Sequence, residues 1–221
     1  MENQSKETTK SQKQEVEIRS LLKRLNFPKD SLYNCLLHYY EKEVRMRGRE
    51  FVWSKEIESN MSAFTEMLCD TTNVFGVMLV GTIGNGKSTM AKAFLEACQF
   101  LERQGRWPFI NDNVKRIHAR RLVELYIERK EKFYEYENCN FLIIDDFGTE
   151  PFEIINYGAK FYPMYDLIES RYDNYKFTII TSNLTNEMIE QKYVERMNDR
   201  LLEMFPINRR IVFTDSSYRH E

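Results

Sequence analysis

The sequence lacks the features that would direct a protein to a membrane or a secretory route. No apolar run approaches the ~20 residues that a membrane-spanning helix needs, and the first residues are polar and unlike a secretion signal. The net charge is only −2 over 221 residues, so any nucleic-acid site must be a local patch rather than a bulk electrostatic effect. We therefore expect a cytoplasmic protein.

Cysteine is also scarce. Four cysteines lie far apart in the chain, and no two of them form a C-x-x-C pair. These residues are Cys35, Cys69, Cys98 and Cys139. Because most of them sit in apolar surroundings, we expect buried free thiols in a reducing compartment.

A glycine-rich loop is the most specific feature that the sequence does contain. Residues 81–88 fit G-x-x-x-x-G-K-[ST] at every fixed position. An apolar run at 74–80 precedes the loop, and residues 89–103 place apolar side chains on one helical face. Strand, loop and helix in this order predict a phosphate-binding loop, because glycines let several backbone N–H groups point at one anion and the helix N-terminus adds partial positive charge.

The side chains of this loop suit a nucleotide with its metal ion. We predict that Lys87 reaches the β- and γ-phosphates of ATP and that the Ser88 hydroxyl ligates Mg²⁺. The residues predicted to bind the nucleotide are Gly81, Thr82, Gly84, Asn85, Gly86, Lys87, Ser88 and Thr89.

Two carboxylates follow a second apolar run. Residues 141–144 are Phe-Leu-Ile-Ile and lead directly into Asp145 and Asp146. This pattern predicts a buried parallel strand that delivers acids to its carboxyl end. We predict that Asp145 serves Mg²⁺ and that Asp146 polarises the attacking water.

A third apolar run, 177–180, ends in Thr-Ser-Asn. The Asn183 amide is predicted to contact the γ-phosphate or the lytic water, with a helix cap by Ser182 or Asn183 as the alternative. A helix is expected over 157–172, with a late start or a kink at Pro163. A further helix over 186–204 and a last strand over 207–213 complete the pattern.

The part of the chain before the loop has a different pattern. Residues 1–14 are polar and predict a disordered tail, whereas 15–70 predict a small helical module with caps at Asp30 or Ser31 and at Ser54. Such a module is too small to bury much surface alone, so we expect it to bind a partner or to pack on the next domain. The 42% hydrophobic content suffices for one core plus such an appendage, with the main domain at 71–221.

Basic residues gather in two further places. Lys115, Arg116, His118, Arg120 and Arg121 form the densest cluster, for which contact with a phosphate backbone and an exposed strand–helix junction are both open interpretations. Arg45, Arg47 and Arg49 suit either a nucleic-acid contact or a solvated helix end.

The order of these motifs resembles the AAA+ class of P-loop ATPases, and within it the DnaC/IstB family of helicase loaders and transposition helpers. The resemblance rests on residues 81–89, 142–148 with Glu150, 171–172, 181–184, 196–201 and 217–219. It implies an α/β fold of the P-loop NTPase (AAA+) type, which is a parallel five-stranded sheet flanked by helices, with the helical module in front and no C-terminal lid domain.

The resemblance also implies roles for single residues. It makes 84 and 86–89 the Walker A residues, Asp145 and Asp146 the Walker B pair, and Asn183 sensor 1. On helix 186–204, Arg200 would be the arginine finger that enters a neighbouring subunit's site, with Arg196 on the same face as the alternative. Glu150 is expected to be a surface acid or else to assist hydrolysis, and Arg219 to stand in for a lid residue.

The leading functional hypothesis is an ATP-hydrolysing DNA-replication factor that assembles as a nucleotide-dependent oligomer on single-stranded DNA with a replicative helicase. The main alternative is a helper ATPase for a transposase on duplex DNA. A small-molecule kinase lacks support because no lid-like insertion is present between the strands. A nucleotide-binding adaptor with incidental hydrolysis also stays open, because an Asp stands at 146 where many AAA+ proteins have Glu.

Overall fold

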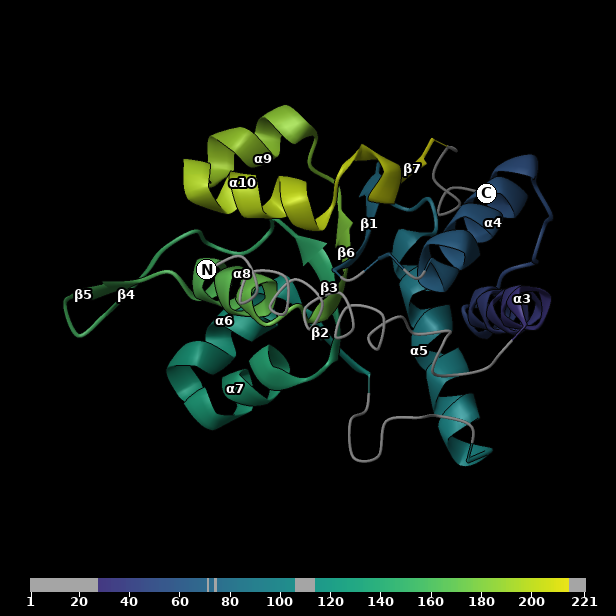
Figure 1. Ribbon diagram of the computed structural model, residues 1–221, viewed down its shortest axis with the longest axis horizontal. Coiled ribbons are helices and arrows are strands. Elements are labelled where there is room, and N and C mark those ends of the chain that lie inside the picture. Colours follow the sequence, from purple (N-terminus) through teal and green to yellow (C-terminus); the bar gives the residue numbers. More distant parts are fainter. Residues whose placement is uncertain (1–27, 71, 74, 106–113, 215–221) are drawn as a thin grey trace, which may run out of the picture.

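A parallel sheet forms the centre of the molecule. The computed structural model describes residues 28–70, 72–73, 75–105 and 114–214. In the described chain, five strands run parallel in the order β2-β3-β6-β1-β7 (Figure 1). The strands are β1 (Gly76–Gly81), β2 (Lys115–His118), β3 (Phe141–Phe147), β6 (Phe177–Ser182) and β7 (Arg210–Phe213). The predicted fold class is therefore confirmed.

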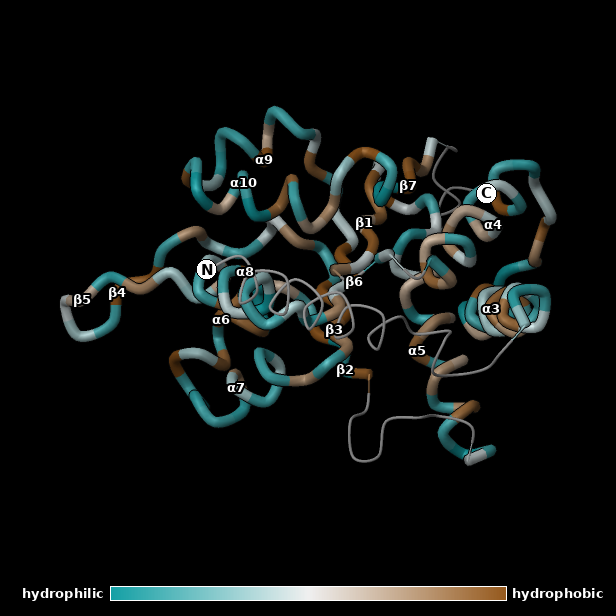
Figure 2. The backbone as a smooth tube through the Cα atoms, in the orientation of Figure 1, coloured by the Kyte–Doolittle hydropathy of each residue, from teal (hydrophilic) through white to brown (hydrophobic). Residues whose placement is uncertain are grey.

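Helices cover both faces of this sheet. One face carries α3 (Lys29–Met46), α4 (Lys55–Cys69) and α5 (Lys87–Arg103). The other carries α6 (Ala119–Glu128), α7 (Lys130–Asn138), α8 (Pro163–Asp173), α9 (Asn186–Lys192) and α10 (Glu195–Met204), as Figure 1 shows. In Figure 2 the hydrophobic colour concentrates on the central strands between these layers.

Side chains alternate between the two faces of the sheet along each strand, and this divides the apolar residues between two cores. In β1, Val77 and Leu79 pack into the core under α3, α4 and α5, whereas Met78 packs into the core on the opposite face. Successive strand side chains point to opposite faces, so a strand that is covered on both sides reads as a continuous apolar run. The same alternation places Ile143 and Ile144 of β3 in different cores.

The helices before the glycine-rich loop belong to the first core. Leu36 of α3 and Met61 of α4 are fully buried in the same cluster as Phe94 of α5. The predicted Ser54 cap is confirmed, since its hydroxyl accepts from the Ile57 N–H at 3.1 Å. The predicted cap of the preceding helix is wrong, because α3 begins at Lys29, directly after Pro28, and Asp30 lies within its first turn.

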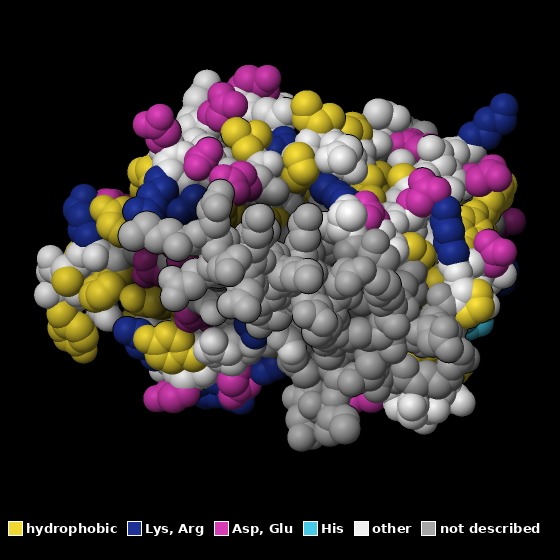
Figure 3. Space-filling view, in the orientation of Figure 1, with side chains coloured by type: hydrophobic (Ala, Val, Ile, Leu, Met, Phe, Trp, Pro, Cys, Tyr) yellow, Lys and Arg dark blue, Asp and Glu magenta, His cyan; other side chains and the backbone are white. Residues whose placement is uncertain are grey.

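The stretch after β3 contains a hairpin that the sequence reading missed. Antiparallel β4 (Ile154–Asn156) and β5 (Ala159–Phe161) form here, so the helix expected over 157–172 has the late start considered for Pro163. Tyr157 and Gly158 have φ of 48° and 81°, as a two-residue turn with two left-handed residues requires. Helix α8 starts only at Pro163, which suits the first helical position. Hydrophobic side chains gather on this hairpin (Figure 3).

Two other predicted elements differ from the observed ones. The single helix expected over 186–204 is divided into α9 and α10 around Tyr193 and Val194. The last strand is shorter than expected, because a 3-10 turn, η1 (Ile207–Arg209), precedes β7. The break between α9 and α10 contains neither glycine nor proline, so the apolar periodicity predicted one continuous helix across it.

Several expectations lie outside the described residues. They are the tail at 1–14, the start of the helical module at 15–27, and the terminal 217–219 with Arg219. Within the described part, none of the helices is both long enough and apolar enough to cross a membrane. All four cysteines are free, and Cys98 and Cys139 are buried.

Candidate nucleotide-binding site

The glycine-rich loop connects β1 to α5 and wraps around its own lysine. Gly84 and Gly86 have φ of 91° and 100°, in the region that favours glycine. The buried Lys87 ammonium donates to the Gly81 carbonyl at 2.8 Å and to Asn85 Oδ1 at 3.0 Å. The lysine thus holds the loop in a closed ring directly in front of the first turn of α5, where backbone N–H groups have no helical acceptor.

Asn85 fixes the loop to the sheet. Its Nδ2 donates to the Phe213 carbonyl of β7 at 2.8 Å, and the residue is buried. Gly81 lies against the same carbonyl, so closely that a Cβ at this position would overlap the oxygen. The Asn85 side chain therefore positions the loop, and only its backbone N–H is left to meet a phosphate.

The two carboxylates at the end of β3 have different surroundings. Asp145 is buried, accepts from the Thr181 hydroxyl at 3.2 Å and forms an ion pair with Arg116. Burial raises the pKa of Asp145, although the Arg116 charge opposes that shift. Asp146 is half-buried, has a left-handed φ of 52°, and lies 3.3 Å from His118 Nε2. Only Asp146 of the two lines the cavity described below.

The Thr-Ser-Asn segment at the end of β6 divides its tasks among three side chains. Thr181 accepts from the Asp146 N–H at 3.0 Å, and Ser182 donates to the Phe147 carbonyl at 2.8 Å. Both therefore tie β6 to the acidic end of β3. The helix cap considered for Ser182 and Asn183 falls instead to Thr185, whose hydroxyl accepts from Met188 N–H. Asn183 is left to line the cavity.

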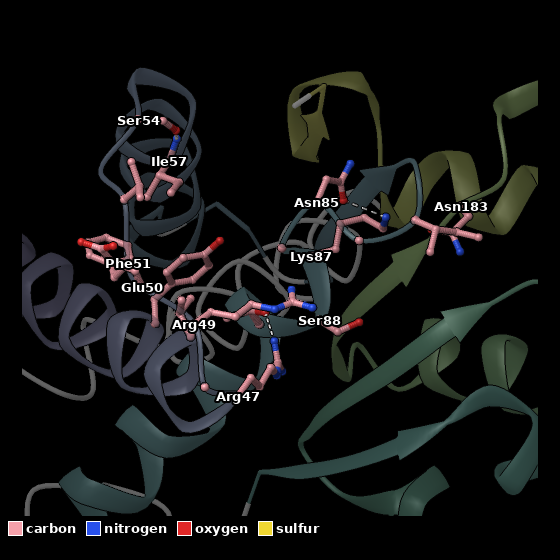
Figure 4. Close-up of a pocket in the computed structure, with 18 of the residues that line it drawn as sticks. Arg47, Arg49, Glu50, Phe51, Ser54, Ile57, Asn85, Lys87, Ser88 and Asn183 are labelled. Carbon is pink, nitrogen blue, oxygen red and sulfur yellow. Dashed lines mark hydrogen bonds between the residues drawn. The ribbon is translucent and has the colours of Figure 1, made fainter. Parts of the chain in front are cut away.

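A cavity of about 900 Å³ opens beside the loop. Residues 83–89 of the loop and helix α5, together with Asp146 and Asn183, form one wall. The opposite wall comes from the end of α3, the α3–α4 connection and the start of α4 (Figure 4). That wall consists of Tyr40, Val44, Arg47, Gly48, Arg49, Glu50, Phe51, Val52, Ser54 and Ile57.

Sequence reasoning missed this second wall completely. The pattern predicts only that the helices before the loop pack on the next domain or on a partner, and it leaves a nucleic-acid contact or a solvated helix end open for Arg47 and Arg49. The one available signal was Phe51, an aromatic residue in the short connection between two helices, because such a residue in a loop usually packs against a neighbouring surface. Which surface it covers depends on the packing of α3 against α5.

Tyr40 of α3 also contacts the loop itself. A Cβ built on Gly86 would overlap the Tyr40 hydroxyl, so glycine is required there both for its backbone angle and for space. The nucleotide loop and the preceding helix are thus fitted to each other.

The basic cluster near β2 is paired within the protein. Lys115 lies 3.0 Å from Glu135, and Arg121 lies 2.8 Å from Glu124 and 3.0 Å from Glu128. Arg120 Nε donates to the Thr149 carbonyl at 2.8 Å, and Arg116 holds Asp145. The DNA contacts predicted for these residues stay a prediction, and binding there would compete with these local pairs.

The arginines of α10 lie over α8. The Arg200 guanidinium stacks on the Tyr172 ring, 4.2 Å from its centroid, and the side chain is 21% exposed. Arg196 forms an ion pair with Glu169 and is largely exposed. Neither lines the cavity of its own chain.

The expectation that Glu150 is a surface acid is wrong. Glu150 is buried, accepts from the Gly148 N–H at 2.8 Å and from the Tyr193 hydroxyl, and its carbonyl accepts from Lys192. Burial raises the pKa of this carboxyl. It holds the β3–β4 connection to α9, so packing rather than catalysis accounts for it.

The residues present fit a nucleoside triphosphate. The left-handed glycines and the α5 N-terminus form an anion cradle, and Tyr40, Val44 and Phe51 offer an apolar surface in the same cavity. For Mg²⁺, Ser88 and the Asp145–Asp146 pair supply hard oxygen ligands. Across the described residues there is no cluster of three or more metal-binding acids, histidines or cysteines. Such a site therefore depends on phosphate oxygens and water, as magnesium sites beside phosphates do.

Comparison with solved structures decides the type of fold. A crystal structure of the DnaC helicase loader aligns with a TM-score of 0.52 at 20% identity, covering 74% of this chain and 93% of that one. The chain has the same fold as this helicase loader. DnaI aligns over 81% of this chain and 93% of its own length, with a TM-score of 0.54 and 16% identity.

A third similar structure is DnaA from Aquifex aeolicus with bound AMPPCP, at a TM-score of 0.50 and 16% identity over 76% of this chain and 50% of that one. No protein-family model and no curated protein sequence matches the chain. The DnaC-like AAA+ resemblance read from the motifs is confirmed at the level of the fold.

Proposed function

We propose that the protein binds ATP with Mg²⁺ in the cavity beside residues 81–88, hydrolyses it, and acts in DNA replication as a factor similar to helicase loaders. One observation carries the proposal. The glycine-rich loop, Asp146 and Asn183 come from three separate strand ends, and all of them line a single cavity of about 900 Å³. Similarity to the DnaC helicase loader and to DnaI supports the replication context.

The side chains divide the chemistry between binding and hydrolysis. Lys87 exchanges its loop carbonyls for phosphate oxygens, and the N–H groups of the α5 N-terminus hold the same anion. Bound Mg²⁺ would neutralise developing phosphate charge, held directly by the Ser88 hydroxyl and through its water ligands by Asp145, which lies behind the cavity wall. Asp146, at the cavity wall and hydrogen-bonded through its N–H to Thr181, orients the attacking water, and Asn183 contacts the terminal phosphate or that water.

A direct binding measurement tests this first step. Titration with ATP, followed by calorimetry, is expected to show magnesium-dependent binding in the wild-type chain and its loss in Lys87→Ala. Lys42→Ala serves as the control, because that lysine pairs with Glu96 outside the cavity. Equal binding by all three proteins would contradict the assignment of the site.

The site is proposed to be completed by a second copy of the chain. Arg200 would enter a neighbour's cavity, which makes hydrolysis depend on assembly. To do so its guanidinium has to leave the Tyr172 ring, a contact worth about 1 kcal/mol at a partly exposed position. Arg196 is the alternative finger. Its side chain is largely exposed, so leaving its ion pair with Glu169 would cost little free energy.

A mixing experiment tests the shared site. Arg200→Ala lacks the finger and Lys87→Ala lacks the loop lysine, so each alone is expected to hydrolyse little ATP. Mixed, they can form one interface with both groups, and part of the activity should return. Normal hydrolysis by Arg200→Ala alone, with no gain on mixing, would overturn the shared site; the same pair of measurements with Arg196→Ala assigns the finger.

Partner and nucleic acid are tested separately. We propose single-stranded DNA and a replicative helicase as partners, held in part by residues 15–70. Light scattering after size exclusion, with and without ATP and single-stranded DNA, should show nucleotide-dependent assembly. Preference for duplex DNA together with capture of a transposase would instead support the transposition-helper alternative.

A further inference from the structure

The α3–α4 connection brings two arginines to the nucleotide cavity. Arg47 is the C-cap residue of α3, and Gly48 follows it with a left-handed φ of 73°. This reversal lets Arg49 extend into the same cavity that Arg47 lines. In Figure 4 both side chains point from the connection toward the Ser88 end of the glycine-rich loop.

Arg47 is already bonded to the phosphate-binding helix. Its guanidinium donates to the Thr89 hydroxyl, and Thr89 lies in the first turn of α5. Lys87 precedes Thr89 by half a turn and faces the β- and γ-phosphates. A cation at Thr89 therefore lies toward the other end of the triphosphate, where the α-phosphate joins the ribose.

The acidic residues near Arg47 and Arg49 do not neutralise these two arginines, whose positive charge is available to an anion. Glu43 is buried and lies 2.8 Å from Lys92 but 3.7 Å from Arg47, so Lys92 is its main partner. In the described part of the chain Arg49 has no ion pair, although Glu50 beside it lines the same cavity. Arg45, one turn earlier, pairs with Glu41 at 2.6 Å and does not line the cavity.

We propose that Arg47 and Arg49 bind the α-phosphate of the nucleotide from the same chain, so that the segment before the P-loop supplies a clamp opposite the loop itself. This inference rests on the proposed ATP site and adds its second wall. Guanidinium groups suit the task because they bind phosphate oxygens in a planar, two-point arrangement. Their place between α3 and α4 also connects nucleotide occupancy directly to the helices in front of the loop.

The clamp predicts a binding loss that is the same for ATP and ADP. Arg47→Gln and Arg49→Gln are each expected to weaken both nucleotides about tenfold, the order expected for one charge-assisted contact. Arg45→Gln, which removes the same charge from the same segment, should bind like wild type. Affinities are measured by calorimetry or with fluorescent nucleotides on the full chain, and a thermal melt without nucleotide shows whether each variant is folded.

The outcomes separate this inference from the proposed function. If wild type and Arg45→Gln bind no nucleotide, the ATP site itself is wrong. If they bind but Arg47→Gln and Arg49→Gln bind equally well, only the clamp is wrong, and a loss confined to ATP overturns its assignment to the α-phosphate. Arg49→Lys, which keeps the charge, should recover part of the affinity, and the loss in Arg49→Gln should shrink at high salt.

Discussion

Two pairs of arginines lie on opposite sides of the sheet and meet different surroundings. Arg47 and Arg49 stand on the connection between α3 and α4 and line the nucleotide cavity. Arg196 and Arg200 stand four residues apart on α10 and lie against Glu169 and Tyr172 of α8. The motif order directed attention to the second pair, yet it is the first that faces the glycine-rich loop of its own chain.

The contrast shows what residue spacing can and cannot determine. Spacing of four on a helix ensures that two side chains share a face, but it does not say what that face meets. At the end of α3 no regular spacing applies, because Gly48 reverses the chain. The position of Arg47 and Arg49 depends on how α3 packs on α5 and its loop, through contacts such as Tyr39 with Phe100 and Tyr40 with Gly86.

Loss of the loop lysine should have the largest effect on the cavity side. Lys87→Ala removes the group proposed to hold the β- and γ-phosphates, and ATP hydrolysis is expected to fall at least about 100-fold. Phosphate release in single-turnover conditions measures the effect. Lys42→Ala, whose lysine pairs with Glu96 outside the cavity, is the control and should hydrolyse ATP like wild type. Undiminished turnover in Lys87→Ala would show that the cavity is not the catalytic site.

On the α10 side the largest effect should be on stability, through Arg171 of α8. This fully buried guanidinium donates to the Cys139 carbonyl at 2.8 Å, the Phe177 carbonyl at 2.7 Å and the Thr178 hydroxyl at 2.9 Å. Arg171→Met leaves these acceptors without a donor, and the free energy of unfolding should fall by about 3 kcal/mol. Urea unfolding of Arg196→Ala, an exposed pair on the same side, should change by less than about 1 kcal/mol. Similar losses in both would contradict this account of α8.

A substitution at Gly86 tests the fit between α3 and the loop. Gly86→Ala forces an alanine to a φ of 100° and against the Tyr40 hydroxyl, which we expect to cost about 2 kcal/mol of stability. Tyr40→Phe removes the hydroxyl, so the double variant should lose less than the sum of the two single changes. Additive losses in thermal or urea unfolding would mean that the helix and the loop are not in contact.

The smallest expected effect is a pH dependence at the joint between β3 and α9. Burial raises the pKa of Glu150 above the ordinary 4.5. A raised pKa in the folded state contributes stability that is present below the unfolded-state value and is lost as the pH rises through the folded-state value. The free energy of unfolding of Glu150→Gln, relative to that of wild type, should therefore be higher near neutral pH than near pH 4.5. A stability difference that does not change with pH would show that this carboxyl is not shifted.

Much of the strand pattern could be predicted because buried parallel strands leave a strong local record. Four apolar residues before Asp145, and three apolar residues with one threonine before Thr181, mark strands covered on both faces, and β3 and β6 lie where these runs predict them. The β4–β5 hairpin was missed because each strand has only three residues, too few for a period to appear. The division of α9 from α10 was missed because the bend has neither glycine nor proline, and a buried Tyr193–Glu150 contact accompanies it instead.

The sequence by itself determined the chemistry of the loop: glycines where the chain must turn back, a lysine at a helix N-terminus, and carboxylates at the end of a buried strand. These are local features, since each follows from the backbone angles and the helix or strand immediately beside it. Only the tertiary structure decided what lies opposite the loop. Arg47 and Phe51 are separated from Lys87 by two elements, α4 and β1, and they meet it because α3 packs on α5 in a shared core.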